Sequence, residues 1–150
     1  MSIKYIHTNI ISKNWEKLST FYQRVFECTP VPPTRDQSGA WLDKGTGLAN
    51  AHLKGIHLRL PGYGDDGPTL EIYQYTNMEN KPSEITANRQ GFGHIAFLVD
   101  DVDLIYKRVL ENGGSTLGEI TNKEVPGVGL LTFVYMCDPD DNIIEIQNWG

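Results

Sequence analysis

The pattern of hydrophobic and polar residues predicts the same succession of secondary-structure elements in both halves of the chain. In the first half, residues 5–11 alternate as in a β-strand, and residues 14–26 place apolar side chains at spacings of three and four, as on one face of a helix. In the second half, residues 94–99 again predict a strand, and residues 101–114 predict a helix that ends at Gly113. Each half therefore begins with a strand followed by a helix.

The first predicted helix is followed by a weaker pattern and then by a hairpin. The prolines between residues 30 and 33 prevent further helix, and the polar, glycine-rich residues up to about 50 predict a loop with one irregular strand. Residue types that favour β-strands occur on both sides of a glycine and proline cluster, over residues 55–60 and 69–75. They predict the two strands of a hairpin.

Three strand patterns follow the second predicted helix. They cover residues 115–120, 130–136 and 143–149, with a loop through Pro126 after the first of them. The second half thus repeats the order strand, helix, then three strands.

The repeat predicts one domain built from two βαβββ modules. The modules cover about residues 3–77 and about residues 91–149. Residues 78–90 are polar, contain a proline and lack a clear period, so we interpret them as the linker between the modules.

Composition and charge narrow the classes of function. The chain has 150 residues, 39% of them hydrophobic and 15 of them glycine, which is ordinary for one globular domain and excludes intrinsic disorder. A total of 13 Lys and Arg against 19 Asp and Glu leaves a net charge of −6, which excludes nucleic acids and anionic membranes as partners.

The chain also lacks the patterns of a membrane or secreted protein. No apolar run approaches the roughly 20 residues of a membrane helix, and the first residues do not resemble a signal peptide, so we expect a cytoplasmic protein. Cys28 and Cys137 stand far apart without a C-x-x-C pair. They predict small buried residues rather than a disulfide or a thiolate zinc site.

Glutamates stand between aliphatic residues in two of the predicted strands. If Glu71 and Glu145 turn inward, each carboxylate needs a hydrogen bond, an opposite charge or a metal ion. The first strand of each half supplies a histidine, His7 and His94. Two imidazoles and two carboxylates suit a divalent ion such as Zn, Ni, Co, Mn or Fe(II). The sequence therefore predicts these four residues as candidate metal ligands.

His57 and Arg59 share one face of the strand predicted over residues 55–60. In one interpretation they reach the cavity and bind a carboxylate of the substrate. In the other they lie on a solvated outer face, which is the interpretation that we favour from the sequence.

These patterns resemble those of the vicinal oxygen chelate superfamily, which includes glyoxalase I, methylmalonyl-CoA epimerase, extradiol dioxygenases and the fosfomycin and bleomycin resistance proteins. The resemblance covers nearly the whole chain. It rests on residues 5–26, 69–75, 91–114 and 138–148, which occur in the order typical of that superfamily.

The resemblance implies an α+β fold in which two βαβββ modules form a curled, partly open eight-stranded barrel around a metal site. It places His7, Glu71, His94 and Glu145 on the four ligand positions, a set most like that of bacterial glyoxalase I. It also implies a small-molecule substrate and a homodimer.

The chain departs from the glutathione-dependent bacterial glyoxalases at two positions. These carry an arginine and an asparagine where Ile11 and Tyr75 stand here. The sequence therefore does not predict glutathione as the thiol component of the substrate.

The resemblance implies a glyoxalase I-like lyase or isomerase that moves a proton next to a carbonyl, with a hemithioacetal as a candidate substrate. A divalent ion would polarise the carbonyl and stabilise an enediolate. We expect Glu145 to act as the base and Glu71 as the second acid–base group. The alternatives are a methylmalonyl-CoA epimerase-like isomerase, oxygen chemistry with Mn or Fe, and a metal-free drug- or metabolite-binding protein of the bleomycin-resistance type.

Overall fold

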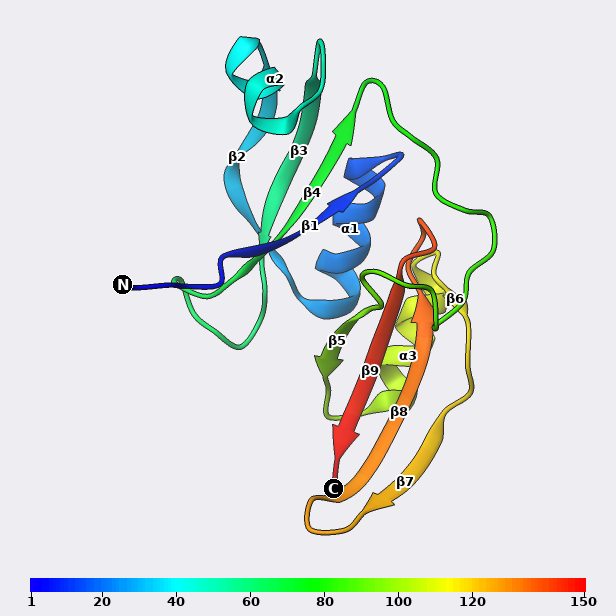
Figure 1. The fold of residues 1–150 in the computed structure, drawn as a ribbon. Helices are drawn as coiled ribbons and strands as arrows, with labels where there is room; N and C mark the ends of the chain where they lie inside the picture. Colours follow the sequence, from blue (N-terminus) through cyan, green and yellow to red (C-terminus); the bar gives the residue numbers. More distant parts are fainter. The chain divides into compact units, whose positions relative to one another are not determined.

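The computed structural model describes residues 1–150, which divide into two compact units, Met1–Lys81 and Pro82–Gly150 (Figure 1). Each unit has its own β-sheet and its own long helix. No helix of the chain has the length and apolar character needed to cross a membrane.

The first unit is a four-stranded sheet with a helix against it. Its elements are β1 (His7–Ile11), α1 (Trp15–Phe26), β2 (Thr29–Ser38), α2 (Ala40–Thr46), β3 (His52–Arg59) and β4 (Thr69–Tyr75). The strand order is β1-β4-β3-β2. Strand β1 is parallel to β4, and the other neighbours are antiparallel. Strand β4 therefore lies between β1 and β3.

Helix α1 forms where the apolar spacing predicted it and packs on β3 and β4 (Figure 1). It begins after Asn14, whose side-chain oxygen accepts a hydrogen bond from the backbone N–H of Lys17 at 3.0 Å. Its buried apolar face consists of Leu18, Phe21, Tyr22, Val25 and Phe26. Helix α1 covers one face of the sheet, and the other face is available for polar side chains.

The second unit repeats this plan with one more strand. Its elements are β5 (Ile95–Leu98), α3 (Val102–Glu111), β6 (Ser115–Thr116), β7 (Thr121–Val125), β8 (Gly129–Cys137) and β9 (Ile143–Trp149). The order is β5-β9-β8-β6, with β7 also paired to β8. Strand β5 is parallel to β9, as β1 is to β4. Helix α3 packs on β8 and β9 (Figure 1).

The α+β fold expected from the sequence is confirmed, but the strand count is wrong. The structure has nine strands in two separate sheets, neither of which closes into a barrel, instead of the expected eight. The additional strand is β7, in a region that the sequence pattern assigned to a loop. The strand predicted over residues 115–120 is limited to Ser115–Thr116.

The region after α1, where the sequence predicted a loop with one irregular strand, contains strand β2 and helix α2. Strand β2 runs through the prolines for ten residues, with an irregular register between Val31 and Arg35. Proline has no backbone N–H group to donate. Strand β2 tolerates prolines because it lies at the edge of its sheet, where one side of the strand pairs with no other strand. The short helix α2, which follows it, was not expected; its Leu42 packs against Ala51 and Leu53.

Candidate metal centre

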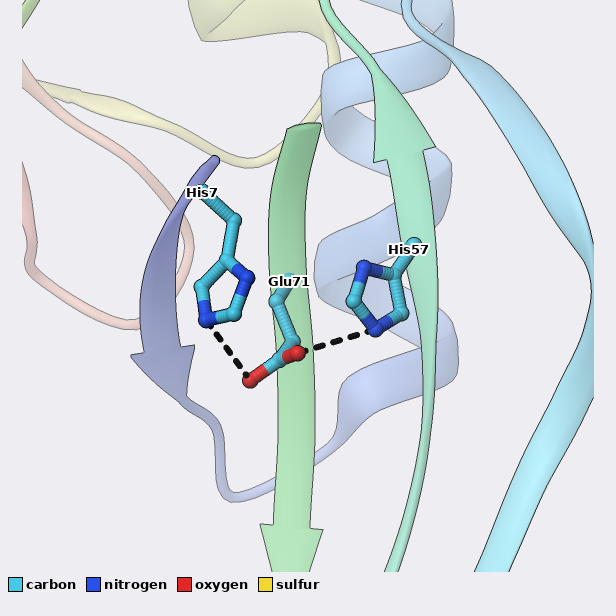
Figure 2. Close-up of side chains that lie close together, drawn as sticks. All are labelled: His7, His57 and Glu71. Atoms are coloured by element: carbon cyan, nitrogen blue, oxygen red, sulfur yellow. Dashed lines mark ion pairs between the residues drawn. The ribbon is translucent and has the colours of Figure 1, made fainter. Parts of the chain in front are cut away.

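Glu71 is a buried carboxylate in the middle of the first sheet, with only 8% of the residue exposed. Its Oε1 accepts a hydrogen bond from Asn9 Nδ2 at 2.8 Å. The same oxygen lies 3.6 Å from His7 Nε2, and Oε2 lies 2.8 Å from His57 Nε2 (Figure 2). The burial cost of the carboxylate is therefore offset by polar partners from both neighbouring strands.

The strand register brings these partners together. Asn9 of β1 lies opposite Glu71 in the parallel pairing, and His7 precedes Asn9 by two positions. Because side chains two positions apart share a face of the sheet, His7, Asn9 and Glu71 project to the same side. His57 of β3 lies opposite Glu71 on the other side of β4.

His57 does not lie on the solvated outer face that we favoured from the sequence. Its side chain is only 17% exposed and contacts Glu71. Its Nδ1 lies 3.2 Å from Thr69 Oγ1, and its Nε2 lies 3.1 Å from the Tyr73 hydroxyl. The alternation correctly placed His57 on the face opposite the buried Ile56 and Leu58, but it did not show that Glu71 lies beside His57 on this face.

The surroundings favour a neutral imidazole at His57. Burial lowers the pKa of His57, Glu71 acts in the opposite direction, and the positive charges of Arg35 and His7 lower the pKa further. Burial also raises the pKa of Tyr73 to about 12, with the charge of Glu71 acting in the same direction. Tyr73 therefore stays a phenol at neutral pH.

The cluster of His7, His57 and Glu71 fits a divalent metal ion. One potential ligand atom from each of the three residues lies within 4.8 Å of the others. Ligands about 2.1 Å from an ion are about 3 to 4 Å apart, so small side-chain adjustments suffice for coordination. Two imidazole nitrogens and a carboxylate oxygen form a donor set that transition-metal ions accept.

The second unit holds the other predicted pair. Glu145 of β9 lies opposite Ala96, and His94 precedes Ala96 by two positions, which is the register found for Glu71 and His7. His94 Nε2 lies 3.0 Å from Glu145 Oε2, and the Glu145 side chain is 13% exposed. Each unit therefore places its histidine beside its glutamate.

The position across β9 distinguishes the second unit from the first. Tyr135 of β8 lies opposite Glu145, where the first unit has His57 opposite Glu71. The Tyr135 ring lies 4.7 Å from the His94 ring between centroids. Burial and the charge of Glu145 raise the pKa of Tyr135.

Arg59 contacts the loop between β3 and β4. Its Nη1 donates a hydrogen bond to the backbone oxygen of Asp65, and its Nε lies 3.8 Å from the Asp65 carboxylate. The substrate-binding role considered for Arg59 stays a prediction.

Three polar residues at these clusters were missed by the sequence analysis: Asn9, Tyr73 and Tyr135. The spacing of two between His7 and Asn9, and between Glu71 and Tyr73, is the signal that could have indicated Asn9 and Tyr73. Tyr135 required knowledge of the antiparallel register between β8 and β9.

Comparison with known proteins agrees with this architecture. Residues 4–146 match the family model described as the Glyoxalase/Bleomycin resistance protein/Dioxygenase superfamily, and the chain belongs to that superfamily. It is also 26% identical over 111 residues to a protein named Glyoxalase 1 from Caenorhabditis elegans. That match covers 73% of this chain and only 37% of the relative.

Solved structures share the fold at low sequence identity. A glyoxalase family protein from Bacillus cereus has a TM-score of 0.75 and 16% identity, and the match covers 98% of this chain and 93% of that chain. The fosfomycin resistance protein FosX from Listeria monocytogenes, in a complex with Mn(II) and 1S,2S-dihydroxypropylphosphonic acid, has a TM-score of 0.57 and 18% identity. That match covers 100% of this chain and 95% of the other.

Proposed function

We propose that this protein is a divalent-metal-dependent enzyme of the glyoxalase I type, a lyase or isomerase that transfers a proton next to a carbonyl. The observation that carries the proposal is the repeated register of one histidine and one glutamate, His7 with Glu71 and His94 with Glu145. Membership of a superfamily that contains glyoxalases supports it.

These four residues are the proposed metal ligands, with Ni, Co, Zn, Mn or Fe(II) as the candidate ions. When bound, the ion would supply Lewis acidity to a carbonyl oxygen of the substrate. The candidate substrate is a small hemithioacetal, and its thiol component is the variable to be tested.

Glu145 is the proposed base. Its carboxylate lies beside His94 with Tyr135 opposite it on β8, whereas the Glu71 carboxylate is held by Asn9 and His57 and lies near His7. A carboxylate with fewer partners is easier to reorient toward a substrate proton. Glu145 would take the proton from the carbon next to the carbonyl, and the proton would return at the neighbouring carbon, so that no atom is gained or lost. Glu71 is the proposed second acid–base group.

Metal analysis of the full chain tests the proposal first. We expect about one ion per chain after stripping with a chelator and reloading with each candidate metal, and weaker retention in His7→Ala and His94→Ala. Wild-type metal content in both variants would contradict the proposed ligand set. Failure to bind any of the metals would favour the metal-free binding protein instead.

Turnover of hemithioacetals formed from methylglyoxal and several thiols tests the reaction. Glu145→Gln should abolish turnover and leave the circular dichroism spectrum unchanged, because the amide cannot accept the proton. The matched control is Glu124→Gln, at an exposed position of β7, which should behave as wild type. Turnover at the wild-type rate in Glu145→Gln would exclude this base.

The proposal includes a homodimer in the cytoplasm. Light scattering during size-exclusion chromatography should give twice the mass of the chain.

A further inference from the structure

The two units differ at one position beside the proposed ligands. In the first unit β3 places His57 opposite Glu71, and in the second unit β8 places Tyr135 opposite Glu145. The flanking histidines occupy the same register in both units. The first unit therefore offers three nitrogen or carboxylate ligands, whereas the second offers two and a phenol.

His57 and His7 approach Glu71 from opposite sides of β4. The two imidazole rings lie 5.7 Å apart between centroids, with an angle of 85° between their planes. Figure 2 shows both rings presenting a nitrogen to the carboxylate between them. An ion placed near this carboxylate would therefore have an imidazole within reach on either side.

The contacts of His57 allow the tautomer that coordination requires. A metal bound to Nε2 needs the ring proton on Nδ1, and a ligand histidine usually donates that proton to a fixed oxygen. Thr69 Oγ1 stands 3.2 Å from Nδ1 and can accept such a hydrogen bond, because a hydroxyl both donates and accepts. The ring would therefore need no large rotation to bind an ion.

We propose that His57 is a third metal ligand contributed by the first unit, so that His7, His57 and Glu71 hold the divalent ion together. The inference rests on the metal dependence in the proposed function and adds an imidazole from β3 to its ligand set. With the four ligands of the proposed function, His57 makes five donors, which leaves one position of a six-coordinate ion for a substrate oxygen.

Titration of the full-length, metal-free protein with Co(II) and Zn(II) tests this proposal. His57→Ala should weaken affinity by more than about 100-fold, beyond the roughly 10- to 100-fold effect of a residue that only orients a ligand. His57→Gln, which keeps a polar side chain of similar length, should also lose affinity. Circular dichroism and urea unfolding establish that both variants are folded.

Spectroscopy identifies the ligand directly. In the Co(II) protein, His57→Gln should lack one set of the paramagnetically shifted imidazole proton resonances seen in the wild type. Two control variants should retain every set: Tyr135→Phe at the equivalent register position, and His52→Ala, a partly exposed histidine that contacts Asp36 at the start of the same strand β3.

Two results would overturn the assignment of His57. One is affinity within about threefold of wild type in both His57 variants. The other is a moderate loss with an unchanged set of shifted resonances, which would make His57 a positioning residue for Glu71.

The experiments distinguish a failure of the proposed function from a failure of the His57 assignment. If His57 binds the ion but the Co(II) and Zn(II) proteins turn over no hemithioacetal, the metal site stands and the glyoxalase I reaction does not. If His94→Ala and Glu145→Gln lower turnover while both His57 variants bind metal normally, the reaction stands and the third ligand does not.

Discussion

The two strand glutamates, Glu71 and Glu145, differ in the side chains that surround their carboxylates. Glu71 and Glu145 occur in similar aliphatic strand sequences, yet Glu71 has His57 opposite it on the next strand, whereas Glu145 has Tyr135 there. The sequence indicated that both carboxylates need partners. The identity of Asn9 and His57 as partners of Glu71 depended on strand pairing between segments far apart in the chain.

Cys28 is a buried thiol whose ionisation should oppose folding at alkaline pH. Burial raises its pKa from an ordinary 9.0 to about 12, so the unfolded chain loses this proton before the native protein does. The unfolded state binds fewer protons in that range, and the free energy of unfolding therefore falls as pH rises above about 9. Urea unfolding between pH 8 and pH 10 should show a smaller fall for Cys28→Ala than for the wild type.

Thiol labelling provides an independent measure of the same burial. At pH 8 the alkylation of Cys28 in the native protein should proceed at the rate at which the protein opens, with peptide mass spectrometry separating it from Cys137. Labelling of Cys28 as fast as that of an exposed thiol would contradict this prediction.

Secondary-structure elements were predicted well where side-chain periodicity was strong. Helices α1 and α3 and the strands β1, β4, β8 and β9 lie close to the ranges that the sequence indicated. The irregular strand expected before residue 50 is β2, whereas helix α2 and strand β7 were missed, because a short length and a polar composition hide the usual period. Their form depends on the neighbouring strands with which β2 and β7 pair.

Gly55 sets how closely β3 approaches β4 beside the metal centre. A Cβ atom at this position would overlap the carbonyl oxygen of Ile72 and lie 2.6 Å from the Tyr73 ring. Gly55→Ala should therefore lower the free energy of unfolding by about 1–3 kcal/mol, measured by urea denaturation. It should also weaken metal binding, since the β3–β4 pairing positions His57 against Glu71.

Gly45 in α2 is the matched control, because a Cβ there would meet nothing within 4 Å. Gly45→Ala should leave stability unchanged or raise it by about 0.5–1 kcal/mol, as expected when alanine replaces glycine in a helix. Equal free energies of unfolding for Gly55→Ala and Gly45→Ala would show that the close approach of β3 and β4 does not restrict the side chain at position 55.

The whole chain consists of two units joined by a segment without regular secondary structure. This segment lies between β4 and β5, its residues are mostly exposed, and it contains the linker that we proposed over residues 78–90. The boundary between the compact units falls within it, after Lys81.

Limited proteolysis tests this organisation. Trypsin should cleave first after Arg89, because this exposed residue lies in the segment and Lys81 is protected by the following Pro82. Mass spectrometry of the early products should find residues 1–89 and 90–150, and Arg89→Gln should remove this cut. A first cut inside α1 or β3 would contradict the proposed linker.

The amino-acid sequence alone determined the α+β class, the repeated order of elements and the two histidine–glutamate pairs. These features follow from periodicity and from the cost of burying a carboxylate without a partner, both of which can be evaluated locally. Tertiary structure decided which side chain of β3 lies beside Glu71, and so made His57 a candidate ligand. Strand register joins residues distant in the chain, and an alternating pattern within one strand cannot specify which side chains of the neighbouring strand will lie beside it.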